Sequence, residues 1–195
     1  MTMSIGLLVF PDMEMLDYAG PYQVFATASK VTSQTQGLET FSLVTIGATL
    51  DPVRVRAGAV LVPQATIHDH PELSCLVVPG GMAGVQAQVD RGELVDWITA
   101  QAETVPIIAS VCTGAFLLAQ TGLLNGLEAT THQNYASTLR QRFPSIEVHE
   151  NQRWVDAGRF VTSAGLSTGI DMSLYLVERL ASRELSVLTA KALEL

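Results

Sequence analysis

Short apolar runs alternate with helix-like stretches along the whole chain. A run of consecutive apolar and β-branched residues predicts a buried strand, whereas apolar residues that recur every three or four positions predict a helix. Strands are expected at residues 4–10, 40–47, 75–79, 105–111 and 128–131, and hairpins at 52–63 and 154–163. Helices are expected at residues 22–29, 94–102, 114–124, 135–143, 168–180 and from about 183 onward.

The order of these elements indicates the fold class. Strands that alternate with helices favour a mainly parallel sheet covered by helices on both faces, a flavodoxin-like three-layer α/β sandwich. The chain has 195 residues and contains no internal repeat, low-complexity tract or linker. This length suits one hydrophobic core, so we expect a single domain over residues 1–195.

Composition narrows the class of protein. Hydrophobic residues make up 48% of the chain and charged residues 15%, as is typical of a globular protein. The formal net charge of −8 repels phosphate backbones and anionic lipids, so neither nucleic acid nor a membrane is an expected partner. No apolar run reaches membrane-spanning length, and the start of the chain lacks the pattern of a signal peptide.

Cysteine usage adds a further constraint. The two cysteines, Cys75 and Cys112, make neither a disulfide framework nor a metal cluster. A cytoplasmic protein with free thiols is the simplest interpretation. For Cys75, within a predicted core strand, a structural role as a small buried hydrophobe is expected.

The surroundings of Cys112 differ from those of Cys75. A strongly β-like run ends at Cys112, and a helix of small and apolar residues begins beyond it. Gly114 and Ala115 allow the start of this helix to lie close to the strand. These are the features of a nucleophile elbow, a sharp turn that presents a reactive side chain at the carboxyl edge of a sheet. Backbone N–H groups and the helix dipole are expected to favour the thiolate there.

A second glycine turn, Gly80-Gly81, follows the strand predicted at residues 75–79. If this strand neighbours the one that ends at Cys112, the backbone N–H groups of Gly81 and Thr113 would converge on developing negative charge.

Taken together, these features resemble the ThiJ/PfpI superfamily, part of the class I glutamine-amidotransferase-like fold, over nearly the whole chain. The markers are Phe10-Pro11-Asp12, Leu16-Asp17, Gly20-Pro21, Val78-Pro79-Gly80-Gly81, Val111-Cys112-Thr113-Gly114, Ala129-Thr130-Thr131-His132, Ser163-Ala164-Gly165 and Gly169-Ile170-Asp171. The resemblance implies a homodimer and an acidic residue after the first strand that meets the cysteine, here Asp17. Burial and like charge would keep this carboxyl partly protonated and suit it to acid catalysis. The alternative for Asp17 is a helix cap.

Departures from the family pattern distinguish its branches. Thr113 stands where the peptidase-like branch has histidine, and no His-x-Glu pair of glutamine amidotransferases occurs near the C-terminus. Asp17 stands where the glyoxalase and deglycase branch has glutamate. Aspartate together with Cys-Thr resembles isonitrile hydratase and the amino-terminal domains of AraC-type regulators. We expect no helix-turn-helix region in this chain.

The resemblance implies addition of water to an isonitrile to give an N-substituted formamide, without a metal or organic cofactor. Cys112 would attack the terminal carbon, Asp17 would transfer protons, and Thr113 would position water. Two alternatives remain open. One is glyoxalase- or deglycase-like action on small carbonyl compounds, and the other is a non-enzymatic module that senses a ligand or an oxidant through Cys112.

The histidines leave further alternatives. His132 follows a short strand, and the resemblance places it near the nucleophile, where it could orient the thiolate; a core or interface histidine is an equal alternative. His68-Asp69-His70 has a spacing that could ligate a metal, but a polar loop explains it better. Asp171 is expected to be a cap or interface group.

Overall fold

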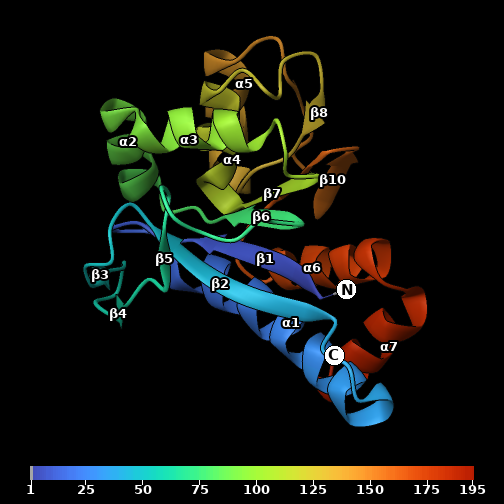
Figure 1. The fold of residues 1–195 in the computed structure, drawn as a ribbon. Helices are drawn as coiled ribbons and strands as arrows, with labels where there is room; N and C mark the ends of the chain where they lie inside the picture. The colour runs from blue at the N-terminus through green and yellow to red at the C-terminus, as the bar shows by residue number, and fades with distance from the viewer. Residues whose placement is uncertain (1) are drawn as a thin grey trace.

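A seven-stranded sheet forms the centre of the computed structural model, which describes residues 2–195 (Figure 1). The strand order is β10-β11-β7-β6-β1-β2-β5, and all neighbours are parallel except β10, which is antiparallel to β11. The strands are β1 (Met3–Leu8), β2 (Phe41–Gly47), β5 (Ala65–Thr66), β6 (Cys75–Val78), β7 (Ile107–Val111), β10 (Trp154–Ala157) and β11 (Phe160–Ser163). Two small sheets pair β3 (Val53–Arg54) with β4 (Val60–Leu61), and β8 (Glu128–Ala129) with β9 (Glu147–Val148).

Helices cover both faces of the sheet. One layer contains α1 (Met15–Gln36), α6 (Thr168–Leu180) and α7 (Arg183–Ala192), which pack against one another. The opposite layer contains α2 (Met82–Arg91), α3 (Glu93–Gln101), α4 (Ala115–Gln120) and α5 (Ala136–Arg142) (Figure 1). This arrangement confirms the predicted three-layer α/β fold.

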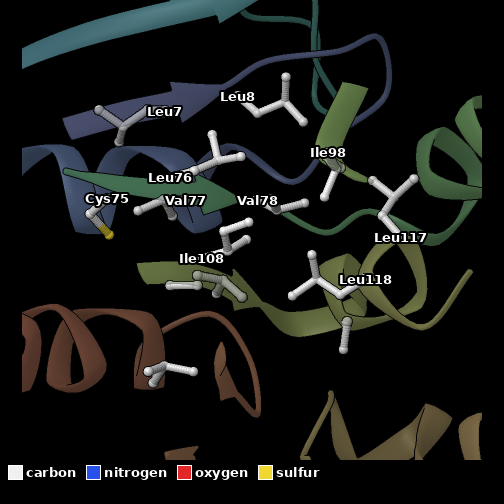
Figure 2. Close-up of a cluster of buried hydrophobic side chains, with 14 of the residues drawn as sticks. Leu7, Leu8, Cys75, Leu76, Val77, Val78, Ile98, Ile108, Leu117 and Leu118 are labelled. Carbon is white, nitrogen blue, oxygen red and sulfur yellow. The ribbon is translucent and has the colours of Figure 1, made fainter. Parts of the chain in front are cut away.

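The core lies along the central strands. Every residue of β6 and β7 is buried, as expected for parallel strands with a helical layer on each side. Figure 2 shows Leu76 and Ile108 of these strands together with Ile98 of α3 and Leu117 of α4. All four side chains are at most 1% exposed. Full burial of one such side chain is worth about 1.5–3 kcal/mol, so this cluster contributes substantially to holding the layers together.

Most predicted elements are present, with three informative differences. The helix α1 begins at Met15, before the predicted segment, and continues through Pro21. The helix predicted at 114–124 ends at Gln120, because Gly122 has a left-handed φ of 79°. The prediction missed α2, in which only Gly84, Val85 and Gln88 are buried, so the sequence pattern there is weak. Both predicted hairpins form.

Among the described residues 2–195, no helix combines the length and apolar character needed to cross a membrane.

The turn after β7 has the geometry predicted for a nucleophile elbow. Cys112 adopts a left-handed φ of 57°, and a 3₁₀ turn, Cys112–Gly114, leads into α4. A Cβ on Gly114 would lie 2.4 Å from the carbonyl oxygen of Val78 and 2.8 Å from that of Pro79. Because both obstructing atoms are backbone, only glycine allows the elbow to pack this closely against the end of β6.

We predict that Gly114→Ala lowers the free energy of unfolding by about 2–3 kcal/mol, because the new methyl group overlaps backbone atoms that cannot move independently. Gly126→Ala is the matched control, since Gly126 has a φ of 76° but open space around it. Its expected cost is about 1 kcal/mol, from backbone strain alone. Urea denaturation measures both. Equal losses in the two variants would contradict the steric account.

Candidate active site

Four neighbouring strands end at the same edge of the sheet, and the segments after them build the site. The strands β11, β7, β6 and β1 are adjacent and parallel, so their carboxyl ends lie side by side. Cys112 follows β7, Gly80 follows β6, Asp17 lies in α1 after β1, and Leu166 follows β11. From β1 the chain adds β2 on one side of the sheet and later β6 on the other side, so a topological switch point lies between β1 and β6. Ligands bind at such points in open α/β sheets.

Asp17 lies in the first turn of α1, beneath the elbow. The side chain is fully buried, and its Oδ2 accepts a hydrogen bond from the Gly80 N–H at 3.0 Å. Among residues 2–195, Oδ1 has no hydrogen-bond partner of normal geometry. Glu14, not Asp17, is the N-cap residue of α1, so the cap alternative was wrong. Asp17 instead connects α1 to the turn after β6.

Burial raises the pKa of Asp17 from 3.8 to about 6. The negative charge of Glu14 adds to this rise, while interactions with the N–H groups of Gly80 and Leu166 and with the Cys112 thiol oppose it. A carboxyl group with a pKa near 6 can both accept and donate a proton at neutral pH.

The pKa of the Cys112 thiol is also raised. Cys112 is 7% exposed, and burial, followed by the negative charge of Asp17, raises its pKa to about 12. Interactions with the backbone N–H and the side chain of Thr113 lower the pKa but are outweighed. The expectation that the turn favours a resting thiolate was therefore wrong: desolvation and a neighbouring carboxylate outweigh the N–H groups at a short 3₁₀ turn.

Thr113 connects the two glycine-containing turns. Its Oγ1 accepts a hydrogen bond from the Gly81 N–H at 2.8 Å, and its side chain also interacts with the Cys112 thiol. The N–H of Gly81 is thus occupied by the threonine hydroxyl and does not point freely toward a reacting atom. This differs from the predicted pair of convergent N–H donors, because the Thr113 hydroxyl lies between the two turns and is the acceptor within reach.

A pocket of about 570 Å³ opens above Cys112. His132 lines it, half-buried, and its Nδ1 accepts a hydrogen bond from the Asn134 N–H at 3.3 Å. The ring carbon Cδ2 of His132 lies 2.9 Å from where a Cβ on Gly165 would be. The resemblance therefore placed His132 near the nucleophile correctly, although no hydrogen bond joins its ring to the thiol among the described residues.

Several pocket residues were missed by sequence reasoning. They come from the β3–β4 hairpin, the cap of α1, the start of α2 and the segments before α5 and α6: Arg56, Ala57, Glu14, Met82, Asn134, Tyr135 and Leu166. Arg56 pairs with Glu14 at 3.4 Å, and its N–H donates to the Met13 carbonyl at 2.9 Å. These contacts are long-range, so no local pattern indicates them.

The predicted histidine motif does not gather into a ligand set. His68 pairs with Glu93 at 3.5 Å, whereas His70 accepts a hydrogen bond from the Trp97 indole at 3.3 Å. Asp171 pairs with Arg153 at the start of α6 and lies outside the pocket lining.

Comparison with known proteins places the chain in a family. The DJ-1/PfpI family model matches residues 3–179. Isonitrile hydratase of Pseudomonas putida is 34% identical over 195 residues, which are 100% of this chain and 79% of that protein. The HTH-type transcriptional regulator GbdR of Pseudomonas aeruginosa is 30% identical over 183 residues, which are 94% of this chain but only 48% of the regulator.

The solved structures agree. A ThiJ/PfpI family protein from Pseudomonas syringae has a TM-score of 0.88 and 29% identity, and the match covers 100% of this chain and 75% of that one. The strand-end cysteine, the fold and the family match all point to one assignment. The chain belongs to the DJ-1/PfpI family.

Proposed function

We propose that this protein hydrates isonitriles to N-substituted formamides, with Cys112 as the nucleophile. The observation that carries the proposal is the buried contact between the Cys112 thiol and the Asp17 carboxyl beneath an open pocket. Hydration of an isonitrile adds a nucleophile and a proton to the same terminal carbon. A thiol and a carboxylate that share one proton supply both.

The protonation states suit this addition. At pH 7 Asp17, with its pKa of about 6, is mostly ionised, while Cys112, with its pKa of about 12, keeps its proton. Asp17 would accept the thiol proton as sulfur attacks and then deliver it to the isonitrile carbon. One S–H bond breaks, and a C–S and a C–H bond form, which gives a thioimidate, R–N=CH–S–Cys112. The nucleophile is thus generated only when substrate is present.

Release would use the same carboxylate. Asp17 removes a proton from water, which attacks the thioimidate carbon, and the tetrahedral intermediate expels the sulfur of Cys112. The nitrogen gains one proton and the thiol regains the other, so that RNC and H₂O give RNHCHO. The hydroxyl of Thr113, fixed by the Gly81 N–H, lies beside the sulfur and would position water there.

The identity of the relative supports this substrate class. The Pseudomonas putida protein that matches this entire chain is an isonitrile hydratase. Action on small carbonyl compounds uses the same pair of residues and stays an alternative. Sensing of a ligand or an oxidant through Cys112 stays a second alternative. The homodimer expected from the resemblance stays a prediction.

We expect formamide to accumulate when the protein is incubated with small alkyl and aryl isonitriles and followed by NMR. Cys112→Ala should reduce the rate at least about a thousandfold, because the attacking atom is lost. Cys75→Ala is the matched control, since Cys75 is buried at the other end of a central strand and should leave turnover intact. Turnover of methylglyoxal but not of isonitriles would replace this proposal with the carbonyl alternative.

The pH profile tests the role of Asp17. We predict that log(kcat/KM) rises with a slope of one up to a pH of about 6 and is then level to at least pH 9, since the base must be ionised and the thiol protonated. Asp17→Asn should remove the rising limb together with most of the rate. A limb centred near pH 8–9 would indicate a resting thiolate and contradict this assignment.

Ionisation of Asp17 should lower the stability of the folded protein as pH rises, over the same range in which kcat/KM increases. Because the folded-state pKa of Asp17 lies about 2 units above 3.8, the folded protein binds more protons between these values, and its stability falls as pH rises from about 4 to 6. The cost above pH 6 is about 3 kcal/mol. Asp17→Asn should therefore be the more stable protein at pH 8, by about 2–3 kcal/mol, and lose this advantage at pH 4.

Urea denaturation at the two pH values measures this effect. The exposed Asp90→Asn is the control and should change stability by less than about 0.5 kcal/mol. An Asp17→Asn variant that is less stable than the wild type at pH 8 would show that the buried carboxylate is not destabilising.

A further inference from the structure

Two buried threonines precede His132, and the proposed mechanism uses neither. Thr130 and Thr131 follow β8 and are both 0% exposed. β8 pairs with β9 in a small separate sheet, and the Thr130 N–H donates to the Thr162 Oγ1 of β11 at 2.8 Å, so these residues lie where that sheet meets the main one. Buried hydroxyls need hydrogen-bond partners, and their partners differ.

The two hydroxyls reach different parts of the molecule. The Thr130 Oγ1 donates to the His149 carbonyl at 2.6 Å, within the β8–β9 region. The Thr131 Oγ1 donates to the Cys112 carbonyl at 2.8 Å, 19 residues away in sequence. Only Thr131 therefore contacts the elbow directly.

We propose that Thr131 is a positioning residue for the reactive thiol, acting through the peptide unit that joins Cys112 to Thr113. This proposal rests on the proposed function only in taking Cys112 as the reactive group.

The geometry of a trans peptide explains the action. The carbonyl of Cys112 and the N–H of Thr113 belong to one planar unit and point in opposite directions. A hydroxyl that holds the carbonyl on one side therefore directs the N–H to the other. That N–H interacts with the Cys112 sulfur and favours its thiolate form. Thr131 thus holds the Thr113 N–H toward the sulfur without contacting the sulfur itself.

The backbone conformation at Cys112 explains why the elbow needs such a restraint. Cys112 has a φ of 57°, a region that residues with a side chain rarely adopt. A Cβ on Gly80 would lie 2.6 Å from the Thr113 nitrogen, so this peptide unit is also confined by the turn after β6. The hydrogen bond from the Thr131 hydroxyl and the close packing against Gly80 together restrict the orientation of the Cys112–Thr113 peptide unit.

The charged and titratable groups around the thiol are Asp17 and Glu14 of α1 and its cap, Arg56 of the hairpin, and His132. Substitution of Thr131 changes none of them. A shift in thiol reactivity would therefore report the orientation of the peptide unit rather than a new charge.

The test compares Thr131→Val, Thr131→Ser and Thr130→Val. Valine keeps the β-branched shape and removes the hydroxyl, whereas serine retains it. Iodoacetamide alkylation of Cys112, followed by peptide mass spectrometry from pH 6 to 10, measures thiolate availability without any isonitrile. We expect Thr131→Val to react about tenfold more slowly at a given pH, as for a thiol pKa about one unit higher. Thr131→Ser should match the wild type.

Thr130→Val controls for the loss of a buried hydroxyl as such. It should lower the melting temperature about as much as Thr131→Val but leave the alkylation profile unchanged. The proposal is overturned if Thr131→Val alkylates like the wild type, if Thr130→Val slows alkylation equally, or if Thr131→Ser is as slow as Thr131→Val. Because alkylation needs no substrate, failure of isonitrile turnover would leave this result interpretable.

Discussion

The site depends on the close contact between the elbow after β7 and the glycine turn after β6. The contact needs glycine on both sides: a Cβ on Gly114 would meet the carbonyls of Val78 and Pro79, and one on Gly80 would meet Thr113 and Asp17. This contact brings the Gly80 N–H to Asp17 and the Gly81 N–H to the Thr113 hydroxyl. The same packing excludes water from Asp17 and Cys112, which raises the pKa values of both groups.

A buried carboxyl beside a buried thiol is costly for folding and useful for chemistry. Because Asp17, with a pKa of about 6, ionises well before Cys112, with a pKa of about 12, the pair holds one proton over a wide pH range. In the proposed reaction that proton is the one added to the substrate carbon. In that reaction the stability lost at Asp17 would be offset by a proton carrier next to Cys112, a trade often found at active sites.

Much of this arrangement could be predicted from the sequence, because the informative signals are local. The apolar run that ends at Cys112, with Gly114 beyond it, indicates a strand, a sharp turn and a close helix, and all three are present. The resemblance located Asp17 and His132 at the site. The pocket walls from Arg56 and Leu166 could not be predicted, since they depend on how a distant hairpin and the segment before α6 fold back over the sheet.

The protonation of Cys112 was the main point on which sequence reasoning went wrong. The turn supplies a donor to the sulfur, as expected, but the degree of burial and the charge of Asp17 are properties of the folded structure. They reverse the direction of the pKa shift. A local motif therefore locates the cysteine at the elbow but does not determine its protonation state.

Ultraviolet absorbance of the thiolate near 240 nm measures the protonation state of Cys112 directly. The spectrum of Cys112→Ala is subtracted from that of the wild type across pH 5 to 9. We expect no thiolate step in this range, because burial and the charge of Asp17 raise the pKa of Cys112 to about 12. A full step with a midpoint below about pH 7, typical of activated cysteines, would contradict it and restore a pre-formed thiolate as the nucleophile.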